Sequence, residues 1–301
     1  MVAMNARTDK KRWLPQLGGA INALFLGLFS LATLYPFWYE AAASFSSSRA
    51  ITSGEVMFWP VEFNIEAYKR LFEDGQLFIS MKNTIWVTFV GTMLNIVLTI
   101  LAAYPLSKKR LLGRSALLMF ITFTMLFVSG LIPNFILVKY LGLMNSYWSL
   151  WLPALISTYN MFVMKTFMEG LPEEIEESAA IDGAGDWRIL VQIIMPLCKP
   201  IVVALSLFYA VGWWNNYFQV MLYIGKSNKQ TLMLKLYQMI RQVDQHLLNP
   251  AGGSEGVMQA MLTPEAIKAA AIVIAITPIL CVYPFLQKHF VKGVLIGSVK
   301  G

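Results

Sequence analysis

Six apolar runs, each long enough to cross a lipid bilayer as a helix, constrain the fold of this chain of 301 residues. A spanning helix takes about 20 residues. Hydrophobic residues make up 57% of the sequence and charged residues only 14%, a composition that argues against a soluble domain. The runs predict an all-α integral membrane protein with six transmembrane helices at residues 17–41, 78–106, 115–140, 147–167, 200–223 and 266–290.

The first run follows a basic segment that contains Arg7, Lys10, Lys11 and Arg12, as the apolar core of a secretory signal does. It is too long for a signal core and has no clear small-residue cleavage site, so we interpret it as an uncleaved first helix. The predicted division is an N-terminal segment (1–16), a first helix with an external loop (17–77), a core with five transmembrane helices (78–290) and a C-terminal tail (291–301).

The net charge of +7 lies beside the apolar runs and does not form one basic face, which argues against nucleic acid as a partner. Lys108, Lys109, Arg110 and Arg114 fill the short connection after the second run. The connection from Leu141 to Ser146 has no Lys or Arg. Under the positive-inside rule, both termini and the segment between the fourth and fifth runs are expected on the cytoplasmic side. The predicted location is a plasma (inner) membrane, which the family resemblance described below implies is bacterial.

A stripe of polar residues follows one face of the second run at helical spacing. Its members are Ser80, Thr84, Thr88, Thr92, Asn95 and Thr99. Lipid offers such groups no hydrogen-bond partner, so the stripe is expected to face other helices or a water-filled path. Hydrogen bonding between helices and the lining of a solute path both remain open, and Thr84, Thr88, Thr92 and Asn95 are the candidate path residues.

The fifth run ends in two adjacent indoles and two adjacent amides. The set comprises Trp213, Trp214, Asn215, Asn216 and Gln219. Aromatic rings stack on the apolar faces of sugars and amides bond their hydroxyls, so Trp213, Asn215, Asn216 and Gln219 are candidates for a carbohydrate path. Trp and Tyr also populate membrane interfaces for purely physical reasons, and that alternative stays open.

The sequence lacks the residues that an ion-coupled carrier, a nucleotide-binding protein or a metalloenzyme usually requires. No carboxylate lies in the middle of an apolar run, where a proton- or sodium-coupled carrier usually needs one. No internal repeat is visible, and no G-x-x-x-x-G-K-[ST] phosphate loop is present. Two histidines and two cysteines, all far apart, predict neither a metal site nor a catalytic triad. We therefore expect a protein that is not an enzyme, binds no cofactor or metal itself, and takes its energy from elsewhere.

An acidic segment between the fourth and fifth runs has the features of a short helix ended by a glycine turn. Pro172 suits a first helical position, and Glu173, Glu174, Glu176 and Glu177 complement the positive end of the helix dipole. Gly183 is placed to end the helix in a left-handed turn, and Asp186 to cap a second short helix. A solvated loop helix and a docking surface for a soluble partner are both consistent with this pattern.

This segment resembles a known motif. Glu177-Ser178-Ala179, Gly183 and Ile193-x-Met195-Pro196 match the spacing of EAA-x3-G-x9-I-x-L-P, the EAA motif of binding-protein-dependent ABC importer permeases. Ser178 replaces an alanine and Met195 a leucine, and both changes roughly conserve size. The stretch from Gly212 to Phe218 resembles the carbohydrate branch of that family, which includes the second maltose-transporter permease and the LplC-like oligosaccharide permeases.

The resemblance implies a type I ABC importer transmembrane subunit with a cytoplasmic coupling helix at about 172–190. The implied coupling residues are Glu173, Glu176, Glu177, Ser178, Ala179, Asp182, Gly183 and Pro196. The implied partners are a second homologous permease subunit, two cytoplasmic ATPase subunits that bind ATP and Mg, an extracytoplasmic solute-binding protein, and membrane lipid.

The function that these features indicate is the pore-forming permease of an ATP-driven importer for sugars, with an oligosaccharide as the expected solute. Two alternatives stay open. One is an importer permease for an anionic uronate oligosaccharide, a polyol or glycerol phosphate, for which Lys82, Lys139 and Lys235 on the outer side would suit an acidic sugar. The other is a secondary carrier without an ATPase, against which the missing repeat and the missing mid-span carboxylate count.

Overall fold

The structure, a computed structural model, describes residues 10–73, 75–127, 129–248 and 263–297, and all regular structure within these ranges is helical. The chain divides into two compact units. The first comprises Met1–Glu73 and Val243–Ile274, and the second comprises Asp74–Gln242 and Ala275–Gly301. The first unit thus includes a segment from late in the chain.

The first unit is built from α1 (Lys10–Ser44), α2 (Ser48–Thr52), α3 (Glu66–Phe72) and the start of α16 (Pro264–Gly297). The short helix α3 buries Ala67 and Leu71. The last helix, predicted at 266–290, begins two residues earlier, at Pro264. Thr263 does not cap it through its side chain, because the Thr263 hydroxyl is buried without a hydrogen-bond partner in the described part of the chain.

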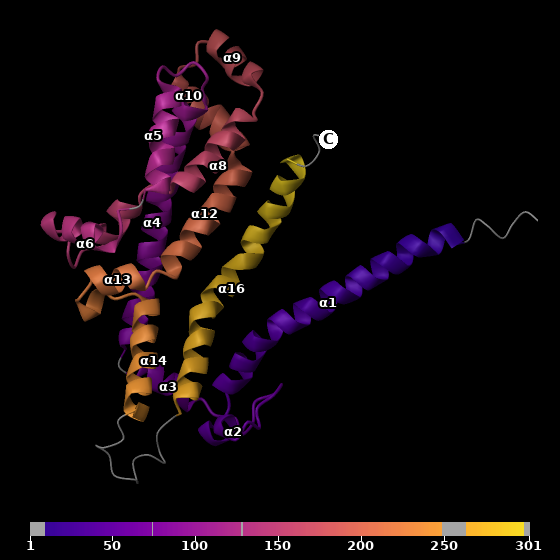
Figure 1. Ribbon diagram of the computed structural model, residues 1–301, viewed down its shortest axis with the longest axis vertical. Helices are drawn as coiled ribbons and strands as arrows, with labels where there is room; N and C mark the ends of the chain where they lie inside the picture. The colour runs from indigo at the N-terminus through magenta and orange to yellow at the C-terminus, as the bar shows by residue number, and fades with distance from the viewer. Residues whose placement is uncertain (1–9, 74, 128, 249–262, 298–301) are drawn as a thin grey trace, which may run out of the picture. The chain divides into compact units, whose positions relative to one another are not determined.

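The second unit is organised around the long helix α4 (Gln76–Ser107), which packs along α8 (Thr158–Glu169) and α12 (Lys199–Trp214) (Figure 1). The apolar run that predicts α4 is interrupted by Pro105 only in its last turn, where a proline ends a helix without breaking its interior. Helix α5 (Arg114–Leu126) also contacts α8.

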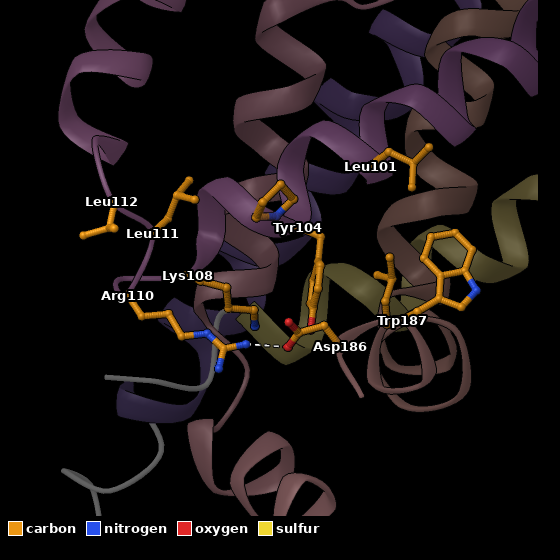
Figure 2. A pocket seen from close by; sticks show the side chains of 10 residues that line it. Leu101, Tyr104, Lys108, Arg110, Leu111, Leu112, Asp186 and Trp187 are labelled. Carbon is orange, nitrogen blue, oxygen red and sulfur yellow. Dashed lines mark hydrogen bonds and ion pairs between the residues drawn. The ribbon is translucent and has the colours of Figure 1, made fainter. Parts of the chain in front are cut away.

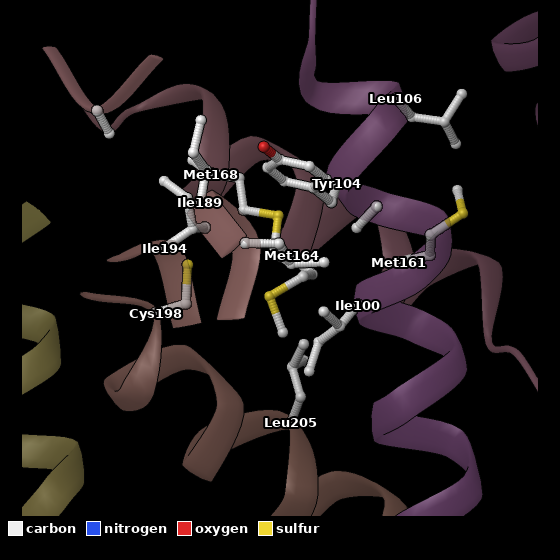
Figure 3. Close-up of a cluster of buried hydrophobic side chains, with 13 residues drawn as sticks. Ile100, Tyr104, Leu106, Met161, Met164, Met168, Ile189, Ile194, Cys198 and Leu205 are labelled. Atoms are coloured by element: carbon white, nitrogen blue, oxygen red, sulfur yellow. The ribbon is translucent and has the colours of Figure 1, made fainter. Parts of the chain in front are cut away.

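A methionine-rich cluster closes the end of the second unit at which α4 stops (Figure 3). It joins residues of α4, α8, α9 (Glu173–Ile181) and α12 with those of α10 (Asp186–Ile189) and the π-helical turn η2 (Leu190–Ile194). Met164, Leu205 and Cys198 are fully buried in it. We call this group the methionine cluster; Cys198 acts in it as a small apolar residue. Cys281, by contrast, is exposed.

A second cluster, rich in tryptophan, lies around the first half of α4. It contains Val87 of α4, Val138 of α6 (Leu131–Tyr140), Leu150 and Trp151 of α7 (Trp148–Trp151), and Trp213 of α12. Residues of α13 (Phe218–Tyr223) and α14 (Leu232–Leu248) complete it. We call this group the tryptophan cluster.

Three helices in the described part of the chain are by themselves long and apolar enough to cross a membrane. They are Ile21–Ser44, Gln76–Ser107 and Pro264–Cys281. Two helix pairs pass the same test together but are bent, by 108° between Arg114–Leu126 and Leu131–Tyr140 and by 80° between Asp186–Leu197 and Lys199–Trp214. The predicted run at 115–140 is therefore not a single straight helix. The run at 200–223 is also not one helix, because α12 ends at Trp214 before α13 begins at Phe218.

The prediction of one continuous helix at 147–167 is wrong. The segment consists of α7, the 3-10 turn η1 (Leu152–Ala154) and α8. Pro153 lies in the turn, and the Ser157 hydroxyl accepts a hydrogen bond from the Asn160 backbone N–H to begin α8. A proline followed by a serine N-cap favours a new helix start over continuation of the old one.

Candidate functional site

The acidic segment forms two short helices joined by a glycine turn. Helix α9 begins at Glu173, one residue later than predicted, with Pro172 as its N-cap. Gly183 adopts a φ of +80°, in the left-handed region expected for it. The Ala184 N–H donates to the Ala179 carbonyl and the Gly183 N–H to the Ala180 carbonyl, both at 3.0 Å. This pair of bonds is a Schellman motif, so the predicted helix end is confirmed.

One side of α9 is anchored and the opposite side is exposed. Ala179 is buried in the methionine cluster. Glu177, Ser178 and Asp182 are exposed, and Ile181 is 86% exposed. The Glu177 carboxylate makes no hydrogen bond or ion pair in the described part of the chain, so α9 offers a surface of free carboxylates, a small hydroxyl and one large apolar side chain.

The basic loop after α4 pairs with the acidic segment, a relationship that the sequence did not reveal. Lys108 binds Glu176, Lys109 Nζ lies 2.8 Å from a Glu173 oxygen, and Arg110 binds Asp186. Arg114, at the start of α5, binds Glu169 at the end of α8. Of the implied coupling carboxylates, Glu173 and Glu176 therefore face their own subunit, whereas Glu177 and Asp182 do not.

In the Lys109–Glu173 pair, each side chain shifts the pKa of the other. The hydrogen bond from Lys109 and the positive charge of its ammonium lower the pKa of Glu173 below its ordinary value. The same contact raises the pKa of Lys109. Both shifts favour the charged form of the group, and salt screens the attraction because both side chains are solvent-exposed.

The second short helix differs from its prediction in one respect. Asp186 is the first residue of α10 and makes no capping bond, because its carboxylate is turned to Arg110 instead. The helical run continues through η2 and α11 (Met195–Leu197), which contains Pro196, and ends before a bend of 80° at Cys198. The Met195 N–H bonds to the Leu190 carbonyl in a π turn, a local widening that absorbs a helix irregularity just before the proline.

A hollow of about 610 Å³ lies between the end of α4, the basic loop and α10 (Figure 2). Leu101, Tyr104 and Leu190 give it an apolar wall, and the Arg110–Asp186 pair crosses it. Trp187, which is 67% exposed, also lines the hollow. The hollow is therefore continuous with the exposed end of the acidic segment.

The polar stripe of α4 is divided between buried hydrogen bonds and hydroxyls without partners. The Thr84 hydroxyl donates to the Ser80 carbonyl at 2.9 Å and accepts from the Leu232 N–H at 2.7 Å. The hydroxyls of Thr88 and Thr92 are buried and have no hydrogen-bond partner in the described part of the chain. Thr99 shares a hydrogen bond of 2.8 Å with the Tyr209 hydroxyl.

Asn95 is the most heavily bonded member of the stripe. Its amide nitrogen donates to the carbonyls of Ala154 and Leu155 at 2.5 and 2.8 Å, and its oxygen accepts the Trp213 indole N–H at 2.6 Å. Ala154 and Leu155 lie in the break before α8, where carbonyls lose their helical partners. Asn95 thus joins α4, the broken segment and α12.

The indole–amide set at the end of α12 is not gathered into one place. Trp213 is buried against Gly91 of α4, while Asn215 is exposed. Asn216 donates to Gln219 at 2.8 Å. The Trp214 indole N–H donates to the Ala275 carbonyl at 3.2 Å, which ties α12 to α16 within the second unit. In this conformation Trp213 and Asn95 bond each other, and Asn215, Asn216 and Gln219 lie nearer the surface.

Residues 95–296 match the model of the family described as binding-protein-dependent transport system inner membrane component. The chain belongs to this family. The match begins at Asn95 and includes α9, the Gly183 turn and Pro196, so the whole acidic segment lies inside the family's shared region. The permease is thus a component of an ABC importer, as its motif indicated.

Two relatives from Bacillus subtilis (strain 168) resemble the permease over nearly all of its length. Protein LplC is 44% identical over 93% of this chain and 94% of its own. The polygalacturonan/rhamnogalacturonan transport system permease protein YtcP is 40% identical over 92% of this chain and 96% of its own.

A solved structure is also similar. The crystal structure of a bacterial ABC transporter involved in the import of the acidic polysaccharide alginate contains a chain that matches with a TM-score of 0.80 and 32% identity. The match covers 96% of the permease and all of that chain. The fold around the acidic segment is therefore that of an importer permease.

Proposed function

We propose that this chain forms half of the pore of an ATP-driven oligosaccharide importer and crosses the bacterial plasma membrane six times. The observation that carries the proposal is α9: an exposed, acidic helix with a glycine turn, anchored to the end of a bundle of apolar helices in the region that matches the family. Relatives named as permeases for oligosaccharides and polysaccharides support a sugar as the solute.

The two clusters lie toward opposite ends of α4, so a segment that contributes residues to both would cross the membrane. Four segments of the second unit do so. Helix α4 runs from the tryptophan cluster to the methionine cluster, and the segment from α7 to α8 runs the same way. Helix α12 runs the other way, from Leu205 to Trp213. The segment from α5 to α6 also runs away from the methionine cluster, because α5 packs on the methionine cluster and α6 on the tryptophan cluster. Val87 and Ile100 are thirteen residues apart on α4, about 20 Å of helix.

Helices α1 and α16 supply the remaining two crossings. Ile21–Ser44 and Pro264–Cys281 are each long and apolar enough to span. With six crossings both termini lie on the side of α9. The dense basic loop after α4 and the proposed docking role of the acidic helix both support a cytoplasmic location for that side.

The proposed partners follow from the two ends of the bundle. At the cytoplasmic end, Glu177, Ser178, Asp182 and the Gly183 turn would enter a cleft of an ATPase subunit that binds ATP and Mg. A second permease subunit would complete the pore, and an extracytoplasmic binding protein would deliver the solute. The candidate path residues Thr88 and Thr92, whose hydroxyls have no partner in the described part of the chain, would meet solute when the helices rearrange.

The test is ATP-dependent uptake by the complete importer in proteoliposomes, with maltooligosaccharide and oligogalacturonate as probes. The ATPase should co-purify with the permease, and uptake should require ATP and the binding protein. Glu177→Lys should abolish uptake while leaving membrane insertion intact. Undiminished uptake by that variant, or uptake by the permease alone driven by an ion gradient, would contradict the proposal.

A second candidate solute, an anionic oligosaccharide, is favoured by the charge at the end of the second unit opposite α9. Residues 75–95, 129–160 and 209–241 contain six basic residues and no acidic one. The six are Lys82, Lys139, Lys226, Lys229, Lys235 and Arg241. The positive-inside rule disfavours such an accumulation on the outer side, and a cationic entrance attracts anionic solutes. The acidic polysaccharides named for YtcP and for the alginate importer agree with this candidate.

Charge selectivity in the same proteoliposomes distinguishes the two candidates. For an anionic solute, oligogalacturonate uptake should exceed neutral galactooligosaccharide uptake, and added salt should reduce its rate. Lys82→Gln with Lys235→Gln should lower the rate several-fold. Equal uptake of neutral and acidic probes would leave the neutral oligosaccharide as the solute.

A further inference from the structure

The loop between α4 and α5 holds the acidic segment through three ion pairs of unequal burial. The Lys108 and Glu176 side chains are 18% and 19% exposed. By contrast, Lys109 and Glu173 are 83% and 70% exposed, and Arg110 and Asp186 are 71% and 70% exposed. Exposed pairs contribute little to holding two elements together. Removal of one partner from a buried pair is far more disruptive, because it leaves an uncompensated charge.

The surroundings of Lys108 fix its ammonium from more than one direction. Its Nζ lies 4.6 Å from the centroid of the Tyr104 ring, one turn earlier on α4, and it donates to a Glu176 oxygen. Tyr104 belongs to the methionine cluster, and so does Ala179, one turn after Glu176 on α9. Lys108 and Glu176 therefore connect two elements that also share an apolar contact.

A second, partly exposed network braces the same end of the bundle. Arg114 binds Glu169, and its Nε donates to the Leu106 carbonyl at 2.8 Å. Lys165, whose side chain is 11% exposed, also binds Glu169 at 2.8 Å. The last turn of α4, the start of α5 and the end of α8 are thus joined immediately beside the Lys108–Glu176 pair.

We propose that Lys108 and Glu176 are positioning residues that make α9 and the end of α4 one rigid body. The inference rests on the proposed function and refines it. Glu176 serves its own subunit and leaves the partner to be recognised by the free carboxylates of Glu177 and Asp182. Movement imposed on α9 by the ATPase then passes directly to α4, the helix that carries the polar stripe.

Neutralisation and charge exchange in the complete importer test the pair. In Glu176→Gln and in Lys108→Met, the ATPase should still co-purify, and the solute transported per ATP hydrolysed should fall at least fivefold. The exchanged variant, Lys108→Glu with Glu176→Lys, should recover at least half of the wild-type ratio. Lys109→Gln is the matched control, because it breaks the neighbouring exposed pair, and its ratio should stay within twofold of wild type.

Cross-linking gives a second measurement that does not depend on a buried charge. The variant Lys108→Cys with Glu176→Cys, in a Cys198→Ala and Cys281→Ser background, would be cross-linked by a short bifunctional thiosulfonate. If α9 and the end of α4 move as one body, the cross-linked importer should reach at least half of the wild-type uptake rate. Loss of uptake on cross-linking with recovery on reduction would show that the two elements move apart, and would overturn the inference.

The neutralised and charge-exchanged variants can also overturn the inference. A ratio within twofold of wild type in both neutralised variants would overturn the inference, as would an exchanged variant no better than the single variants. Failure of the proposed function is recognised separately, because then the wild-type complex itself would show no ATP-dependent uptake. If the single variants do not assemble, the cross-linked pair alone decides.

Discussion

The Asn95 side-chain oxygen accepts the indole N–H of Trp213 at 2.6 Å, across 118 residues of sequence. The same amide donates to the carbonyls of Ala154 and Leu155. Three elements that approach one another at mid-bundle therefore depend on a single side chain. In lipid, a carbonyl released from a helix has no water to replace its lost partner, so the break before α8 requires a donor such as Asn95.

We expect Asn95→Ala to destabilise the permease by about 2 to 3 kcal/mol, because it leaves two carbonyls and an indole N–H without partners. Thermal or denaturant unfolding of the purified protein in detergent measures the change. Asn216→Ala is the control, since within the described residues the Asn216 side chain bonds only the nearby Gln219, and its loss should change stability by less than about 0.5 kcal/mol. Equal effects in the two variants would contradict the role assigned to Asn95.

Close packing of Trp213 on α4 makes a second prediction. A Cβ atom on Gly91 would lie 2.6 Å from the Trp213 ring, so Gly91→Ala should destabilise the protein by about 1 to 3 kcal/mol through overpacking. A Cβ on Gly212 would meet nothing within 4 Å, and Gly212→Ala should be neutral or stabilising. Adding Trp213→Leu to Gly91→Ala should give less than the sum of the two single effects, which a double-mutant cycle measures.

Local features of the sequence predicted the acidic segment well. Acidic residues after Pro172 and a glycine ten positions after Glu173 are short-range signals, and the structure forms α9 and its left-handed turn where they predict. The polar spacing on α4 likewise placed Ser80, Thr84, Asn95 and Thr99 on a buried face. Such signals depend on residues only a few positions apart.

Features that depend on distant residues were not predicted. The partner of Lys108 is 68 residues away, so a basic loop next to a span indicated topology and did not reveal an ion pair with α9. The break in 147–167 is stabilised by Asn95, which is about 60 residues away, and composition alone made that run look continuous. The local sequence predicts that Asp186 caps a helix. It does not reveal the competing partner, Arg110, because Arg110 lies 76 residues earlier.

The two cysteines provide a test of the methionine cluster. In a Cys281→Ser variant, Cys198 is the one remaining thiol and is fully buried. A lipid-soluble fluorogenic maleimide should therefore react only as the cluster opens, with a sharp rise at the unfolding temperature. In Cys198→Ser, where only the exposed Cys281 remains, reaction should occur at room temperature. Immediate reaction of Cys198 in the folded protein would contradict its burial.

Substitutions at the Gly183 turn can distinguish backbone strain within the permease from loss of contact with the ATPase. At a φ of +80°, Gly183→Ala should cost about 1 to 2 kcal/mol of strain, although a Cβ there would meet nothing within 4 Å. Gly185→Ala is the matched control, because Gly185 has a φ of −74° and equally open surroundings.

Unfolding of the isolated permease measures the strain, and uptake by the complete importer measures coupling. We expect Gly185→Ala to leave stability unchanged and Gly183→Ala to reduce uptake far more than its strain explains, because the turn lies on the surface that meets the ATPase. A loss of uptake in Gly183→Ala that matches its loss of folded protein would assign the glycine to folding alone.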